Sequence, residues 1–228
     1  MSIQRILQRT LKAFEPRPRS NRGSIRHRPF RVEALEQRRL LAVFSVNSAL
    51  DTIDANPGDG LAQDAAGNTT LRAAIMEANA SPSADTINLP AGTYNLTLTG
   101  FGENGAATGD LDITEDLTIA GADAATTTID ATALLDRIFD LREEATVAIS
   151  GLTLTGGKAG NSGTYAGHED NGGAVRADYL TNWTLTGCVL TGNSAPNSSF
   201  GQGGAIDNSD GELSLVNQLA LHAAGKIH

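Results

Sequence analysis

The most constraining feature of this sequence is a short repeat in its second half. Gly172-Gly173-Ala174-Val175 returns as Gly203-Gly204-Ala205-Ile206, 31 residues later. Around these copies the chain consists of short alternating apolar runs separated by Gly, Asn, Asp and Thr. A repeat of about 20–35 residues with several short strands is typical of a solenoid, in which each coil buries its inward face only against its neighbours.

The apolar runs define the strands of this solenoid. They alternate at period two and each spans only a few residues: 111–113, 117–119, 128–129, 138–141, 147–149 and 152–154. Parallel coils stacked about 4.8 Å apart would share backbone hydrogen bonds and cover one another's apolar side chains. The sequence therefore predicts an all-β fold, a right-handed single-stranded parallel β-helix over residues 96–217. The inward positions are expected to be Ala174, Val175, Leu185, Val189, Leu190, Ala205, Ile206, Leu213 and Leu215.

Composition agrees with many short strands and tight turns. The 228 residues include 25 Gly and only 4% aromatics, which disfavours helices packed on helices. A jelly roll or an up-and-down sandwich is the structural alternative, and it would need longer strands joined by hairpins. The single Cys, Cys188, excludes an intramolecular disulfide.

Residues 43–95 predict a strand–loop–helix unit that caps the β-helix. A strand is expected at 44–48, a turn-rich loop at 51–67, a helix at 70–79 and a strand at 93–99. Thr70 is the expected N-cap, and Pro82 prevents continuation of the helix. The loop segment 54–60 is similar to a calcium loop, but Gly58 stands at its third ligand position, so a turn-rich loop is the preferred interpretation. The buried face of the helix should hold Leu71, Ala74, Ile75 and Ala78, with Arg72 and Glu77 solvated or locally paired.

Residues 1–42 differ in kind from the rest. They carry 11 Lys and Arg against 3 acidic residues, whereas residues 43–228 carry 6 against 23. The basic segment predicts a largely disordered region for export or targeting, and a nucleic-acid-binding arm is the rival interpretation. The acidic body argues against nucleic acid as a partner. No run reaches the roughly 18 consecutive apolar residues of a membrane span.

Three segments resemble bacterial surface proteins. Residues 31–42, RVEALEQRRLLA, resemble the LEPR-XLL motif of large secreted proteins of planctomycete-like bacteria. Residues 44–94 resemble the CSLREA region, with Ala62 and Thr69 where that family has Cys and Ala73 where it has Glu. The Gly-Gly-Ala-Ile coils are similar to those of chlamydial polymorphic outer-membrane proteins. The resemblance implies a β-helix at the cell surface, outer membrane or outside the cell.

Several charged groups are candidate sites, because β-helix enzymes that cleave polysaccharides use clustered acids. Asp110, Asp112, Glu115 and Asp116 are expected to form a solvated acidic edge, and Arg137 with Asp140 an ion pair at the edge of a coil. A metal or ligand at the remaining groups is the less favoured interpretation. The full set is Asp110, Asp112, Glu115, Asp116, Asp136, Arg137, Asp140, Arg142, His168, Glu169, Asp170, Asp207 and Asp210. None is assigned as catalytic, cofactor-binding or metal-binding.

The sequence thus predicts a non-catalytic cell-surface or secreted protein used for adhesion or as a cell-envelope scaffold. The alternative is a carbohydrate-active β-helix enzyme, a polysaccharide lyase or glycoside hydrolase. Envelope polysaccharide or other surface proteins are the expected partners. Residues 218–228 form a different tail, and coils without a polar cap predict end-to-end self-association through an open strand edge.

Overall fold

The computed structural model describes residues 41–142, 144–159, 171–196, 204–208, 211–217 and 220–224. The chain divides into residues 1–37 and residues 38–228, and all described residues belong to the second part. Predictions for residues 1–40, for His168, Glu169 and Asp170, and for Asp210 lie outside the described residues.

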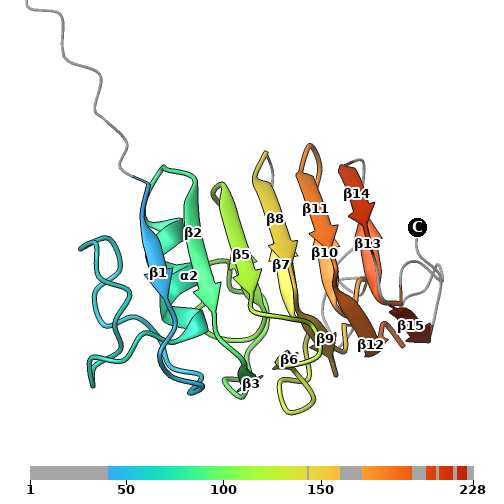
Figure 1. Ribbon diagram of the computed structural model, residues 1–228, viewed down its shortest axis with the longest axis horizontal. Coiled ribbons are helices and arrows are strands. Elements are labelled where there is room, and N and C mark those ends of the chain that lie inside the picture. Colours follow the sequence, from blue (N-terminus) through green and yellow to red (C-terminus); the bar gives the residue numbers. More distant parts are fainter. Residues whose placement is uncertain are drawn as a thin grey trace, which may run out of the picture. The chain divides into compact units, whose positions relative to one another are not determined.

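Three parallel sheets run along this part of the chain, and the chain visits them in turn, coil after coil (Figure 1). The first sheet is β1 (Val43–Ser45), β2 (Asp85–Leu89), β5 (Leu117–Gly121), β8 (Thr146–Ser150), β11 (Asn182–Thr186) and β14 (Glu212–Val216). The second is β3 (Gly92–Asn95), β6 (Thr127–Asp130), β9 (Thr153–Thr155), β12 (Val189–Ser194) and β15 (Ala220–Ala224). The third is β4 (Leu111–Ile113), β7 (Phe139–Leu141), β10 (Val175–Ala177) and β13 (Ile206–Asn208).

All pairings between these strands are parallel, which confirms the right-handed parallel β-helix and rules out hairpin-joined sandwiches for the described residues. The two copies of the repeat lie in register, because Val175 pairs with Ile206 and Ala174 N–H donates to Ala205 O at 2.7 Å. Gly173, which precedes Ala174, cannot be replaced by a larger residue without a steric clash. A Cβ on Gly173 would lie 2.4 Å from Ser194 O and 2.7 Å from Gly204 O.

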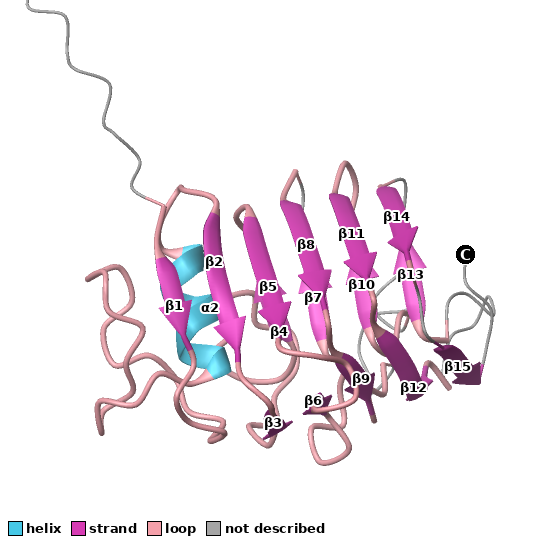
Figure 2. Ribbon diagram, in the orientation of Figure 1, coloured by secondary structure: helices cyan, strands magenta, loops and turns pink. Residues whose placement is uncertain are grey.

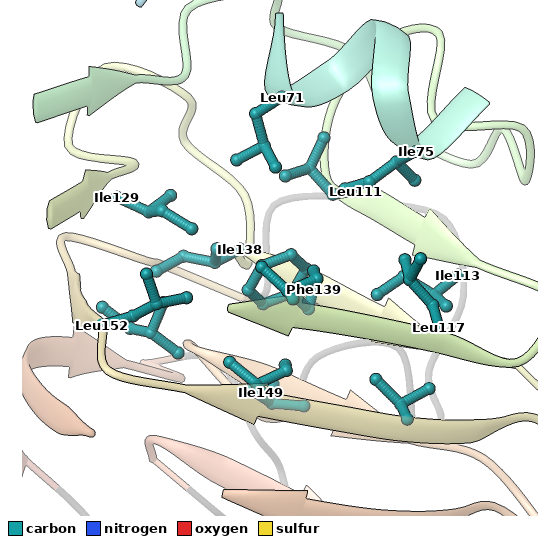
Figure 3. Close-up of a cluster of buried hydrophobic side chains, with 14 of the residues drawn as sticks. Leu71, Ile75, Leu111, Ile113, Leu117, Ile129, Ile138, Phe139, Ile149 and Leu152 are labelled. Atoms are coloured by element: carbon teal, nitrogen blue, oxygen red, sulfur yellow. The ribbon is translucent and has the colours of Figure 1, made fainter. Parts of the chain in front are cut away.

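The core is a continuous column of aliphatic side chains with Phe139 near its centre (Figure 3). Most predicted inward positions are confirmed, since Ala174, Val175, Leu185, Leu190, Ala205 and Ile206 are fully buried. One position was wrong, and another faces inward without being buried. Val189 is half-buried on the outer face, in register with Thr153, because inward alternation in β12 begins at Leu190. Leu215 pairs with the inward Leu185 but is 44% exposed, since among the described residues no strand continues the sheet beyond β14.

The predicted capping helix is α2 (Leu71–Asn79), and Figure 2 shows it beside β1 and β2 at the first end of the ladder. The Thr70 hydroxyl accepts a hydrogen bond from Ala73 N–H at 3.1 Å, as expected of an N-cap. Leu71 and Ile75 point from the helix towards Leu111, so the helix covers the end of the apolar column (Figure 3).

Two charged residues of α2 are locally paired. Arg72 and Glu77 are buried, at 0% and 2% exposure, so of the two expected states, solvated or locally paired, they are paired and not solvated. Glu77 accepts hydrogen bonds from Gly58 N–H and Gly60 N–H, and so anchors the turn-rich loop. Arg72 pairs with Asp51 and donates to the carbonyls of Ala106 and Gly109.

Two strands extend the ladder beyond the predicted runs. β2 was not anticipated, although Asp85–Leu89 alternates buried and more exposed positions. β15 lies within the expected tail and pairs with β12, so parallel pairing continues past residue 217. In the described part of the chain, no helix has the length and apolar character needed to span a membrane.

Candidate functional site

A rank of charged residues crosses the third sheet. Asp112 of β4, Asp140 of β7, Arg176 of β10 and Asp207 of β13 occupy the middle position of their three-residue strands and lie in register. Their flanking residues, such as Leu111 and Ile113, are fully buried in the core, so the middle side chains point to the outer face.

These outward-pointing side chains are nevertheless buried. Asp112 is 0% exposed, and Asp140, Arg176 and Asp207 do not exceed 8%. The segment before β4 covers Asp112, because Ala106 N–H donates to Asp112 Oδ2 at 3.2 Å. Arg72 holds this segment from the helix side through its two carbonyl contacts. The loop before β4 thus converts part of an exposed sheet face into an interior site.

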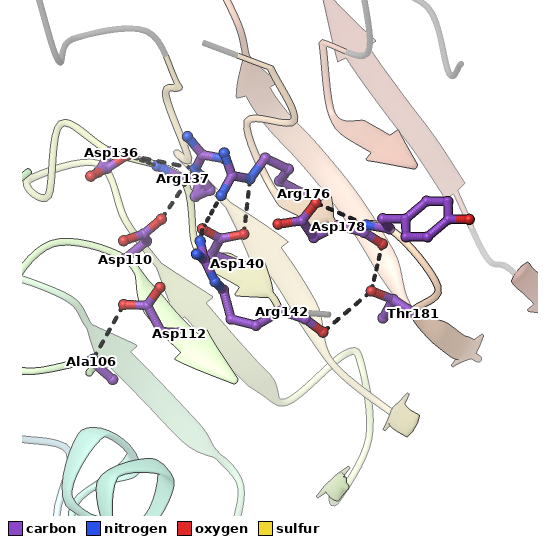
Figure 4. A network of polar contacts seen from close by, with 11 residues as sticks. Ala106, Asp110, Asp112, Asp136, Arg137, Asp140, Arg142, Arg176, Asp178 and Thr181 are labelled. Carbon is purple, nitrogen blue, oxygen red and sulfur yellow. Dashed lines mark hydrogen bonds and ion pairs between the residues drawn. The ribbon is translucent and has the colours of Figure 1, made fainter. Parts of the chain in front are cut away.

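Three arginines pair with carboxylates in this site (Figure 4). Arg176 binds Asp140 through two hydrogen bonds, Nε to Oδ1 at 2.9 Å and Nη2 to Oδ2 at 2.6 Å. Arg142 Nη1 reaches the same Asp140 Oδ2 at 3.0 Å. Arg137 Nε lies 3.1 Å from Asp110 Oδ2 and 3.9 Å from Asp136 Oδ1.

Burial and neighbouring acids raise the pKa of several of these carboxyl groups. Burial is the largest cause for Asp112, whose pKa rises to about 7, and the charge of Asp140 adds to it. Burial also raises the pKa of Asp110 well above its usual range, opposed by Arg137. The pKa of Asp136 is raised by burial too, again against the effect of Arg137.

The acids that lie closest together are Asp110, Asp112 and Asp140. One oxygen of each lies within 4.8 Å of the others, and all three residues are buried. Carboxylate oxygens so arranged have the chemistry to hold a hard divalent cation or to share a proton. Asp112 Oδ1 is buried and has no hydrogen-bond partner. This cluster, Asp110, Asp112 and Asp140, is called the acidic triad below.

Several predictions for these residues need correction. Asp110 and Asp112 are buried and are therefore not part of a solvated edge, and the preceding loop contacts Asp112 through Ala106 N–H. Asp116 is exposed as expected and accepts a hydrogen bond from Thr146 N–H. Asp140 pairs with Arg142 and Arg176, whereas Arg137 lies against Asp110 and Asp136, so the predicted partner of Arg137 was wrong.

Sequence reasoning missed Arg176, which sits at the centre of the site. The signal was present in the repeat. Aligning Gly-Gly-Ala-Val with Gly-Gly-Ala-Ile places the next residues, Arg176 and Asp207, at the same position of consecutive coils. A charged residue at each such position would have indicated a cross-strand ion pair.

A second acidic feature lies in the loop at residues 51–67. It contains a pocket of about 300 Å³ lined by Asp54, Ala55, Asn56, Asp59, Leu61, Gln63, Asp64, Ala65 and Gly67. The carboxylates bind the loop's own backbone, as Asp54 Oδ1 accepts from Asn56 N–H and Asp59 Oδ1 from Leu61 N–H. Burial raises the pKa of Asp54. These contacts are those of a turn-rich loop.

Comparison of the chain with protein-family models, with curated proteins and with solved structures gave no match. The resemblances to LEPR-XLL, CSLREA and polymorphic outer-membrane proteins therefore stay predictions.

Proposed function

We propose that this protein is a non-catalytic β-helix that works at the cell surface or outside the cell, in adhesion or as an envelope scaffold. The observation that carries the proposal is the outer face of the first sheet. Two ranks of small, uncharged, partly exposed side chains cross it from β2 to β14: Thr86, Thr118, Ala148, Thr184 and Ser214, and Asn88, Ala120, Ser150, Thr186 and Val216.

Such a face suits contact with an extended partner. Successive strands repeat about every 4.8 Å, so the positions along each rank are evenly spaced, and most of them carry a hydroxyl or amide group. The chain as a whole has a net charge of −9, and these two ranks carry no charge, so an anionic polysaccharide can approach them with little direct repulsion. The neighbouring outward position of β14 carries an exposed acid, Glu212. The predicted resemblance to surface proteins also favours this use.

The charged site supports a non-catalytic role. A glycosidase needs a carboxyl pair that a sugar can reach from both sides of the bond to be broken. Here Asp112 is 0% exposed and Asp140 is held by two arginines. This arrangement resembles a structural ion-pair network more than a reaction site.

The test is co-sedimentation of the purified full-length protein with isolated cell envelope and with its polysaccharide fraction. We expect binding that is lost when Thr118 and Thr184 are replaced by Glu. The matched control is Glu at Thr128 and Thr155, which are half-buried outward positions of the second sheet. Equal binding by both double variants, or no binding by the unaltered protein, would contradict the proposal.

A carbohydrate-active enzyme is the second candidate, and one observation favours it. Asp112 has a pKa of about 7 and belongs to the acidic triad with Asp110 and Asp140, so one carboxyl is available as an acid near neutral pH. An assay on acidic polysaccharides, with and without calcium, distinguishes the two. Turnover by the unaltered protein that disappears in Asp136→Asn or Asp140→Asn would establish the enzyme and refute the non-catalytic role.

A further inference from the structure

The ion pairs around the acidic triad leave one of its acids without an arginine partner in the described part of the chain. Among the described residues, Asp110 and Asp136 form ion pairs with Arg137, and Asp140 forms ion pairs with Arg142 and Arg176. Asp112 is the acid that makes no ion pair with any of these arginines in the described part of the chain. A fully buried carboxylate without a counter-charge carries a large desolvation cost.

A second observation concerns a single atom. The backbone of Ala106 holds Asp112 Oδ2, whereas Asp112 Oδ1 is inaccessible to solvent and lacks a hydrogen-bond partner. In Figure 4 the Asp112 carboxyl group faces those of Asp110 and Asp140, with its other oxygen directed towards Ala106. Buried polar atoms are almost always satisfied, so an orphaned carboxylate oxygen aimed at two other carboxylates indicates a missing cationic partner.

We propose that Asp110, Asp112 and Asp140 bind a calcium ion. Oxygen atoms within 4.8 Å of one another fit around one Ca²⁺, whose ligands lie at about 2.3–2.6 Å. Ca²⁺ accepts irregular sets of oxygen ligands, whereas Mg²⁺ demands near-octahedral geometry and usually keeps several waters, which suits a buried protein site less well. The ion supplies a positive charge beside Asp112, which forms no ion pair with these three arginines among the described residues.

The surroundings allow the ion to enter and to be held. The Asp110 side chain keeps 11% exposure, so the acidic triad is reached from its side. Asp112 is fixed by the loop before β4, and Asp140 by Arg142 and Arg176, so the ligands are held in place before binding. The ion would tie that loop to β4 and β7. This inference is independent of the proposed adhesion or scaffold role.

Isothermal titration of CaCl₂ into the full-length, EDTA-treated and dialysed protein tests the site, without any polysaccharide. We expect one calcium per chain and an affinity reduced at least about tenfold in Asp112→Asn, since a charged ligand is lost. Asn at this position keeps an oxygen for Ala106 N–H, and it removes a buried charge, so the variant should fold. Circular dichroism checks this, and Asp110→Asn replaces it if Asp112→Asn is unfolded.

Two controls locate the ion. Glu115→Gln removes a negative charge three residues away. Asp54→Asn removes the carboxylate, in the loop at residues 51–67, whose Oδ2 is buried without a hydrogen-bond partner. Both should bind calcium like the unaltered protein. Absence of binding at millimolar calcium, unchanged binding by Asp112→Asn, or loss of binding in Asp54→Asn alone would each overturn the proposal.

Discussion

Arg72 Nε lies 2.6 Å from Asp51 Oδ1, and the two side chains are 0% and 1% exposed. Asp51 Oδ2 in turn accepts hydrogen bonds from Thr97 N–H and Leu98 N–H. One ion pair therefore joins the capping helix, the loop after β1 and the segment that leads over β4. It explains why an apparently solvent-facing arginine of the helix is buried.

Replacing Arg72 by Met should lower the free energy of unfolding by about 3–5 kcal/mol, because Asp51 is left as a buried unpaired charge. Urea denaturation followed by circular dichroism measures this. The control is Arg142→Met, whose side chain is 28% exposed and whose partner Asp140 keeps Arg176. That change should cost no more than about 1 kcal/mol. Equal losses in the two variants would refute a special role for the Arg72 pair.

Gly173→Ala should destabilise the protein by about 1–3 kcal/mol, because the new methyl group would overlap the backbone carbonyls of Ser194 and Gly204. Gly105→Ala is the matched control, since its Cβ would meet only a Glu103 side-chain oxygen at 3.5 Å. Thermal melting of both variants makes the comparison. A Gly173→Ala variant as stable as Gly105→Ala would mean that the coils are not packed as closely as described.

Stability should fall as the pH rises from about 4 to 7 in EDTA. The folded-state pKa of Asp112, about 7, lies above its ordinary value of 3.8. The folded protein therefore keeps a proton that the unfolded chain releases in this range, and the loss reaches at most about 4 kcal/mol. Asp140 and Glu103 raise this pKa, whereas Ala106 N–H and Arg142 lower it.

Urea unfolding at several pH values tests this effect. Asp112→Asn should give a shallower decline, although Asp110 and Asp136, whose pKa values are also raised by burial, keep part of it. Below about pH 4 the sign reverses for Asp64, whose pKa is lowered chiefly by the Asn68 backbone hydrogen bond. An unaltered slope in Asp112→Asn would show that this group does not hold the proton.

Thr70→Ala should cost about 0.5–2 kcal/mol, because the N-cap hydrogen bond to Ala73 N–H disappears. The Thr70 hydroxyl also donates to Thr52 O at 2.6 Å, so the helix start loses its tie to the loop as well. Thr70→Ser retains both hydrogen bonds and should lose far less. Chemical denaturation of the two variants gives the comparison, and identical losses would contradict the cap.

The fold could be predicted from the sequence because the alternation of apolar residues within each short strand identifies which side chains face the core. Val175 and Ile206 follow the same Gly-Gly-Ala triplet, and their alternation alone places them in the core. β2 was missed because its alternating residues, 85–89, lie in the connection between the helix and the next strand, without a recognisable repeat.

The site was harder to predict, because it depends on contacts between distant coils. From the sequence alternation, Asp112 is predicted to be an ordinary outward-facing residue, and it is buried because the loop that carries Ala106 covers it. Asp140 and Arg176 are 36 residues apart, and the connections between coils differ in length, so their register is not visible from spacing. The partners of Arg137 follow from the same register.

Because the charges across the third sheet follow a specific order, the coils of this protein are not interchangeable. Arg176 lies between Asp140 and Asp207, and it holds Asp140 by two hydrogen bonds. Deleting the coil that contains Arg176 would place Asp140 next to Asp207 in a buried position. Duplicating that coil would place two guanidinium groups next to each other. Solenoids commonly grow and shrink by whole-module gene duplication and loss. In this protein such changes would be selected against unless a compensating charge change arose in the adjacent module.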